Sequence, residues 1–187
     1  MAKWFIFPGH GGKDSGATGN GLIEKDINLV VSLELKRVLV LNGQKVKMAR
    51  TNDTFVDLQK GYEMANTWNA EYCISPHENA GGGDGFEVIY QLRGGKSKQL
   101  AELIAEEFKA LGQNLRKVYS RESDNRPGQD YYAGLSIPKC PAVITEFAFI
   151  DNKNDAKSID TKAEQKKVGQ AIAKACLKLI GIQSIKI

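Results

Sequence analysis

The chain has 187 residues, of which 42% are apolar and 26% are charged, and its net charge is +4. This balance is typical of one globular domain and excludes a disordered chain, a collagen and a coiled coil. Dispersed charges and the lack of any apolar run near ~18 residues argue against nucleic-acid binding and membrane insertion. The three distant cysteines, Cys73, Cys140 and Cys176, allow no disulfide framework, so we expect them to be reduced and mostly buried.

The start of the chain lacks the features of an export signal. Only four apolar residues, at positions 4–7, follow Lys3. A signal peptide needs an apolar core of about 7–15 residues and a cleavage site of small residues. We therefore expect a protein that is made in the cytoplasm without a signal peptide.

Strand and helix patterns alternate along the chain. The sequence predicts strands at residues 3–7, 45–48, 71–75, 85–91 and 141–147. Helical spacing of apolar residues predicts helices at about residues 25–41, 56–68, 97–111 and 161–179. We expect Ser97 to cap the third helix, and Thr161 with Glu164 to form a capping box at the fourth. Asn42-Gly43, Gly112 and Gly181 are expected to end helices.

This alternation predicts an α/β fold with a largely parallel sheet. The run at residues 141–147 is apolar except for Glu146, which indicates a central strand covered on both faces. One domain should span residues 1–181, and residues 182–187 form a C-terminal tail or a truncated linker.

Both histidines follow directly after predicted strands. His10 comes after the strand at residues 3–7, and His77 comes after the strand at residues 71–75. Ligands of parallel sheets bind beyond the carboxyl ends of the strands. The two imidazoles are therefore expected at the same edge of the sheet, and the alternative is that each is a solvated side chain of a loop.

Glu24 is the third candidate, because it stands where the first long helix begins. A carboxylate there is favoured by the helix dipole, but a glycine-rich loop at residues 9–21 could also bring Glu24 beside His10. Two imidazoles and one carboxylate are the protein ligands of a catalytic zinc site with an open fourth position.

Glu146 is the fourth candidate. A carboxylate in an apolar strand is costly to bury, so Glu146 is either turned to solvent or serves as a general base tuned by burial. Glu78 is a weaker candidate, because neighbours on an extended segment point to opposite sides and Glu78 follows His77.

Several motifs resemble those of zinc-dependent N-acetylmuramoyl-L-alanine amidases and follow one another along the chain in the same order as in that family. Its members occur as bacterial autolysins and phage endolysins. The matching segments are FPGHGGKDSGA at residues 7–17, GLIEKD at 21–26, RTND at 50–53, SPHENA at 75–80, GFEV at 85–88 and PAVITEFAFIDN at 141–152. The similarity runs from about residue 3 to residue 175. Phe7 departs from the family, which usually has an aspartate there, and this would remove a contact that orients His10.

The resemblance implies a single α/β domain with a mixed, mostly parallel twisted sheet flanked by helices on both faces. It implies a zinc ion (Zn2+) bound by His10, Glu24 and His77, with Glu146 as the catalytic acid and base. The reaction would be hydrolysis of the amide bond between N-acetylmuramic acid and the L-alanine of the stem peptide, so the partner is peptidoglycan.

The setting that we expect is a phage endolysin, released to the cell wall through a phage-made membrane pore, because no signal peptide is seen. A bacterial autolysin is the alternative. A zinc peptidase or deacetylase on a related scaffold, and a wall-recognition module without catalysis, stay open. Many family members carry a separate cell-wall-binding domain, which could have been removed at the tail.

Overall fold

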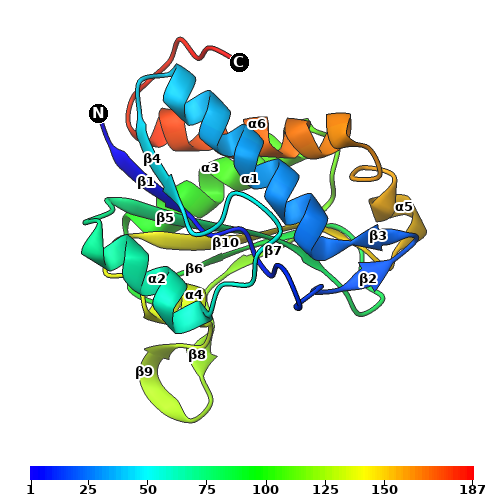
Figure 1. Ribbon diagram of the computed structural model, residues 1–187, viewed down its shortest axis with the longest axis horizontal. Helices are drawn as coiled ribbons and strands as arrows, with labels where there is room; N and C mark the ends of the chain where they lie inside the picture. The colour runs from blue at the N-terminus through cyan, green and yellow to red at the C-terminus, as the bar shows by residue number, and fades with distance from the viewer.

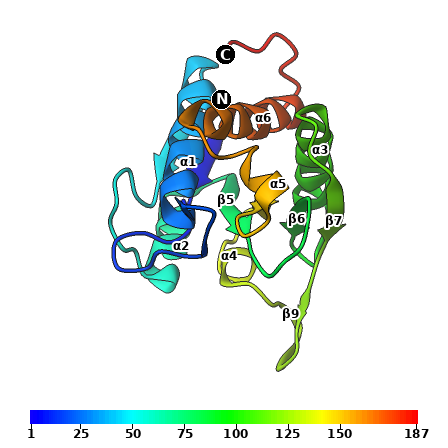
Figure 2. The same ribbon diagram turned by 90° about the vertical axis from the view of Figure 1, so that its right-hand side faces the viewer.

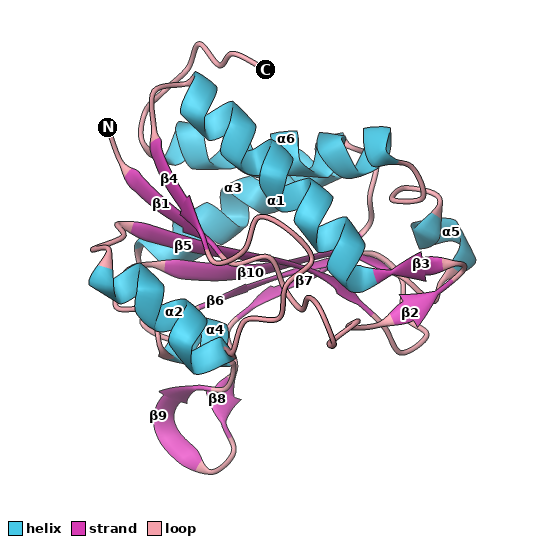
Figure 3. Ribbon diagram, viewed as in Figure 1, coloured by secondary structure: helices cyan, strands magenta, loops and turns pink.

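A six-stranded sheet runs through the middle of the molecule in the computed structural model, which describes residues 1–187 (Figures 1 and 3). The strands lie in the order β4 (Lys45–Met48), β1 (Lys3–Ile6), β5 (Tyr72–Asn79), β10 (Ala142–Phe149), β6 (Phe86–Tyr90) and β7 (Leu115–Tyr119). Only β10 and β6 pair antiparallel, and the other neighbours are parallel. The prediction of a mixed, mostly parallel sheet is confirmed, and β10 is central in it.

Three long helices cover one face of the sheet, as Figure 2 shows from the side. They are α1 (Glu24–Leu41), α3 (Lys96–Ala110) and α6 (Lys162–Leu179). Their apolar stripes and the facing strand residues form a core cluster of 29 buried residues. The helices α1 and α6 approach closely at Gly169, where a Cβ atom would lie 2.5 Å from the carbonyl oxygen of Val31.

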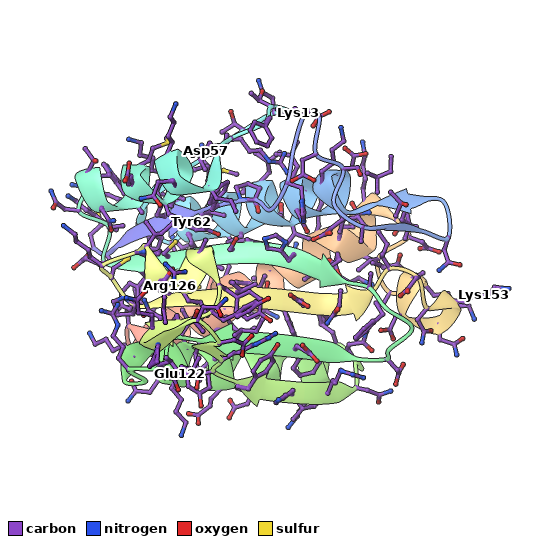
Figure 4. All side chains as sticks on the ribbon, turned by 90° about the horizontal axis from the view of Figure 1, so that it is seen from below. Lys13, Asp57, Tyr62, Glu122, Arg126 and Lys153 are labelled. Atoms are coloured by element: carbon purple, nitrogen blue, oxygen red, sulfur yellow. The ribbon has the colours of Figure 1, made fainter.

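The opposite face is covered only in part. The short helices α2 (Leu58–Thr67) and α4 (Ala133–Ser136) pack there over a second cluster of 10 buried residues. A hairpin of β8 (Glu122–Ser123) and β9 (Arg126–Asp130) projects from the same end of this face, while α5 (Lys153–Ala156) lies at the other end (Figure 4). The predicted helices on both faces are therefore present, but one face leaves strand residues accessible.

The strand at β5 is longer than predicted. It continues from Ser75 through Pro76 and His77 to Asn79. A proline is tolerated because β1 has already ended at Ile6, so the missing N–H of Pro76 faces the loop that follows β1 and not a ladder partner. His77 therefore lies within a strand and not in the loop after it.

Two other predictions of local structure were wrong. Ser97 does not cap α3, because the helix begins one residue earlier after a turn at Gly94 and Gly95, and the Ser97 hydroxyl donates to the carbonyl of Gly94. The second helix is also shorter than residues 56–68. The strands β2 (Thr18–Gly19), β3 (Leu22–Ile23), β7, β8 and β9 and the short helices α4 and α5 were not predicted.

The predicted helix ends are confirmed, and so is the prediction that the cysteines are unpaired and buried. Thr161 and Glu164 form the capping box of α6, and α1 ends at Asn42 and Gly43. All three cysteines are free and buried.

The C-terminal tail folds back onto α1, where the backbone of Lys186 exchanges two hydrogen bonds with the Asn42 side chain. No helix combines the length and the apolar composition that crossing a bilayer requires.

Candidate metal centre

His10 lies in the loop that leaves the carboxyl end of β1. The loop is fastened to β5 by a hydrogen bond of 3.1 Å from the Gly9 N–H to the Pro76 carbonyl. His10 itself has a φ of 60°, which few side chains adopt without strain. Strained backbone of this kind persists where the surrounding structure fixes it, and it is common at functional sites.

Glu24 reaches His10 because the chain turns back on itself in the β2–β3 hairpin. The hairpin ends directly at Glu24, the first residue of α1. Its Oε2 lies 3.2 Å from His10 Nε2, and its Oε1 lies 2.9 Å from His77 Nδ1. His77 is 53 positions away from Glu24 in the chain, and the three predicted ligands nevertheless meet around one carboxylate.

The donor set fits a divalent metal ion. One ligand atom from each of His10, Glu24 and His77 can be chosen so that all lie within 4.8 Å of one another. Ligand atoms at 2.0–2.2 Å from a tetrahedral zinc ion lie about 3.4 Å apart. The two imidazoles lie 3.2 and 2.9 Å from different oxygen atoms of Glu24, so each already lies close to this distance from the carboxylate.

Asp14 fixes the orientation of the His10 ring. Its Oδ2 lies 2.9 Å from His10 Nδ1, which leaves Nε2 directed at Glu24. A carboxylate on the second ring nitrogen is a usual partner of a metal-bound imidazole. Asp14 therefore orients His10, while the Phe7 ring packs edge-on against Tyr62 with the ring centroids 4.4 Å apart.

Two glycines let the ligands come this close. A Cβ atom at Gly9 would lie 2.2 Å from the His77 ring. A Cβ atom at Gly16 would lie 2.5 Å from Glu24 Oε2 and 2.6 Å from the His10 ring, and Gly16 has a φ of +64°. No other residue type fits these two positions without moving a ligand.

The ligands strongly influence one another's protonation. The hydrogen bond with Glu24 raises the pKa of His10 to about 9, against the opposing effect of burial. Burial alone would raise the pKa of Glu24, but the hydrogen bonds with His10 and His77 outweigh it and hold that pKa well below its usual range. Glu24 is therefore an ionised carboxylate, as a metal ligand must be.

Glu146 lies on β10, opposite His77 of β5 on one side and opposite Glu87 of β6 on the other. Its side chain is partly buried, and burial raises its pKa to about 8, with further contributions from the carboxylates of Glu87 and Glu24. Glu87 is held by Arg116 Nε at 2.8 Å. A carboxyl group with a pKa near neutrality can both accept and donate a proton.

The sequence profile of the N-acetylmuramoyl-L-alanine amidase family matches residues 5–178. The chain belongs to this family.

Several known proteins are similar to most of this chain. The N-acetylmuramoyl-L-alanine amidase CwlM of Bacillus licheniformis is 38% identical over 166 residues, which are 87% of this chain and 62% of that protein. The endolysin of Bacillus phage SPP1 is 31% identical over 94% of this chain and 65% of its own length. The structure of Cwp6 from Clostridium difficile superposes with a TM-score of 0.92 and 31% identity, covering 96% of this chain and 29% of that one. The chain spans about three fifths of the two sequence relatives.

One buried residue of this amidase-family site had no predicted role. Arg50 follows β4, and its guanidinium donates to the carbonyl oxygens of Pro8, Gly9, Lys25 and Asn52 at 2.9–3.2 Å. Gly9 precedes His10, and Lys25 follows Glu24, so Arg50 ties two ligand segments together. The only signal in the sequence was its place in the RTND segment, because long-range hydrogen bonds leave no spacing pattern.

Asn28 and Asp14 also had no predicted role, and Glu78, the weaker candidate, is held by β10. Asn28 Nδ2 donates to Glu24 Oε1 at 3.3 Å from the next turn of α1. Glu78 is buried, and its carboxylate accepts the Ala148 N–H at 2.9 Å. The strand geometry therefore points Glu78 away from the two imidazoles, as the alternation along an extended segment predicts.

Proposed function

We propose that this chain is a zinc-dependent N-acetylmuramoyl-L-alanine amidase that hydrolyses peptidoglycan between N-acetylmuramic acid and the L-alanine of the stem peptide. The observation that carries the proposal is the meeting of His10, Glu24 and His77 within ligand distance, with His77 on the strand that pairs with the strand of Glu146. Family membership and the identity with CwlM support the choice of substrate. The catalytic unit is residues 1–181.

His10, Glu24 and His77 would hold the ion. A bound zinc ion supplies Lewis acidity, which polarises a carbonyl and acidifies water. Asp14 would keep the His10 ring in the tautomer that presents Nε2, since its Oδ2 lies 2.9 Å from Nδ1. Asn28 and the N–H of Ala17 hold the Glu24 carboxylate in place by hydrogen bonds of 3.3 and 2.8 Å.

Glu146 would move the proton. Its carboxylate takes a proton from the attacking water while the water oxygen forms a bond to the amide carbon. The carbon–nitrogen bond then breaks, and Glu146 returns the proton to the leaving nitrogen. The products are the lactyl carboxylate of the sugar and the free amino group of L-alanine.

The test is the end group that the protein releases. Purified wall peptidoglycan is digested with the metal-loaded protein, and the products are identified by mass spectrometry after labelling of new amino groups. We expect new N-terminal L-alanine and unchanged sugar chains. New amino groups on other stem residues would indicate a peptidase, and loss of acetyl groups would indicate a deacetylase, so either result would contradict the proposal.

The role of Glu146 is tested by Glu146→Gln, with Glu102→Gln as the matched control. Glu102 is an exposed glutamate on α3 with only a long ion pair of 3.9 Å to Lys98. We expect Glu146→Gln to bind zinc at full stoichiometry and to lose more than about a hundredfold in rate, the usual size of general acid–base catalysis. Glu102→Gln should match the wild type. Zinc content measured by elemental analysis separates loss of chemistry from loss of metal.

We further propose that the chain acts as a phage endolysin, supported by its 31% identity with the SPP1 phage endolysin. The 38% identity with the bacterial CwlM supports the alternative, an autolysin. The protein is expressed in the cytoplasm of a Gram-positive host with and without a pore-forming phage holin. An endolysin lyses the cells only with the holin, and lysis without it would argue against this role.

A further inference from the structure

The central strand β10 is irregular directly after Glu146. Glu146 is in register with His77 of the neighbouring strand β5, whereas the next pair in register is Phe149 with Asn79. This interval contains two residues of β10 and one residue of β5, so it is a β-bulge. Bulges bend the strand, disrupt the ladder locally and are over-represented next to active sites, where they redirect side chains. The bulge therefore sets the direction in which β10 leaves Glu146.

The burial of the bulged residues shows that the regular alternation of β10 is lost. Phe147 and Ala148 are consecutive, yet both belong to the core cluster under the long helices. Successive side chains of a regular strand point to opposite faces. In a regular strand, Ala148 would share the face of Glu146. Phe149 follows Glu146 there instead, with its ring 5.1 Å from the guanidinium of Arg116.

The bulge leaves main-chain donors without ladder partners, and side-chain carboxylates accept from them. The N–H of Ala148, a fully buried residue, donates to Glu78 Oε2 at 2.9 Å. The next N–H, that of Phe149, donates to Asp155 Oδ2 at 2.8 Å. Glu78 and Asp155 are themselves only 5% and 3% exposed. Since a buried N–H without a partner is costly, these two acceptors stabilise the bulge.

Glu78 also contacts the candidate metal centre through its main chain. Its N–H donates at 3.1 Å to Glu24 Oε1, the same oxygen that lies 2.9 Å from His77 Nδ1. Glu78 also follows His77 directly on β5. One residue therefore contacts a candidate metal ligand with its main chain and the strand of Glu146 with its side chain.

We propose that Glu78 is a positioning residue, whose side chain fixes the bulge of β10 and thereby holds Glu146 in place relative to the metal ligands. The inference rests on the proposed amidase function and adds to it a residue that acts through another residue. The alternative is that Glu78 only fills space in the core. In that case any side chain of similar size would serve equally well.

The test compares Glu78→Gln with Glu78→Met. Both new side chains are uncharged and close to glutamate in size, but only glutamine has an oxygen that can accept the Ala148 N–H. The kcat and KM values are measured from the L-alanine amine released from a soluble N-acetylmuramoyl tripeptide. Zinc content is measured by elemental analysis, and stability is measured by urea unfolding. Hydrogen exchange of the Ala148 amide is followed by NMR in the metal-free protein.

We expect the kcat of Glu78→Met to be about 10–100-fold lower than that of Glu78→Gln, because a displacement of about 1 Å costs rate on this scale. Glu78→Gln should recover most of the wild-type rate. The KM and the zinc content should be alike in the two variants, because the change concerns a group that acts in the chemical step. The Ala148 amide should exchange about tenfold faster in Glu78→Met, which is the usual effect of one lost hydrogen bond.

Gln44→Met is the control, because it removes the same kind of contact far from the site. Gln44 is 8% exposed, and its Oε1 accepts the Ala2 N–H at 2.8 Å. Both residues directly precede strands of the sheet, at the end opposite the candidate metal centre. Gln44→Met should lower the stability and leave kcat at the wild-type value. A rate that simply follows stability in all variants would indicate a structural role for Glu78 and overturn the inference.

The two proposals fail in different ways. If the wild type releases L-alanine but the two Glu78 variants have equal kcat values, or equally protected Ala148 amides, only this inference is overturned. A loss of zinc in Glu78→Met alone would place the effect on the ligands and also overturn it. A hundredfold loss of rate in Glu78→Gln would do the same, and this comparison with the wild type remains if Glu78→Met does not fold. If the wild type releases no L-alanine, the amidase function fails and the inference falls with it.

Discussion

Replacing Arg50 by lysine should weaken metal binding without unfolding the protein. The Arg50 side chain is 4% exposed and joins the segment before His10 to the segment after Glu24 through four carbonyl oxygens. Lysine keeps the positive charge but offers a single nitrogen in place of a planar fork. It can therefore satisfy some of these carbonyls but not all of them.

The size of the effect follows from the lost hydrogen bonds. Each bond from a charged donor contributes about 1.5–3 kcal/mol, and we assume that Arg50→Lys loses two of the four. The free energy of unfolding should fall by about 3–6 kcal/mol, which a domain in the upper part of the usual stability range of about 5–15 kcal/mol can survive. The affinity for zinc should fall about 10–100-fold, as is usual when a partner that positions metal ligands is removed.

The assay is competition for zinc between the protein and a chromophoric chelator, together with urea unfolding of the metal-free form. Arg93→Lys is the matched control, because Arg93 also donates to backbone carbonyls, those of Lys139 and Cys140, but none of them adjoins a ligand. Arg93→Lys should lower stability and leave zinc affinity unchanged. Equal zinc affinities in the two variants would refute the argument that Arg50 positions the ligands.

Three further substitutions test separate parts of the structure. Gly16→Ala should reduce zinc affinity at least tenfold in the chelator assay, because the new Cβ would displace a ligand. Gly94→Ala is the control, since Gly94 has nearly the same φ but open space around it. It should lower only the free energy of unfolding, by about 1–2 kcal/mol of backbone strain. Thr161→Ala removes the capping box of α6 and should lower the free energy of unfolding in urea by about 1 kcal/mol, with zinc affinity unaffected. Gly169→Ala should destabilise by about 1–3 kcal/mol despite its better helix propensity, since its Cβ would meet the Val31 carbonyl; an increase in melting temperature would contradict this.

Local signals in the sequence were reliable where the interaction itself is local. The capping box needs only residues three positions apart, and Thr161 and Glu164 form it as predicted. The β10 strand also follows from its apolar run, which extends to Phe149 because Ala148 and Phe149 are buried as well. Ser97 shows the limit, because the glycine pair before it allowed the helix to begin earlier.

Features that depend on residues far apart in the chain could not be predicted from local sequence patterns. The β7 strand is mostly exposed at an edge of the sheet, so its residues lack a clear apolar alternation. The continuation of β5 through Pro76 depends on where its neighbour β1 stops. Both outcomes depend on a partner strand that lies far away in the sequence.

The sequence alone predicted the α/β class and the central strand, because periodicity carries that information, and it made His10, Glu24, His77 and Glu146 candidates through their residue types and their places after strands, at a helix start and within an apolar run. Only the tertiary structure decided how these side chains are held. The contacts of Asp14 and Arg50 and the close approach at Gly16 arise from backbone segments packed together in space. The bulge of β10 beside Glu146 likewise depends on a carboxylate from another strand, that of Glu78, so no single stretch of the chain contains it.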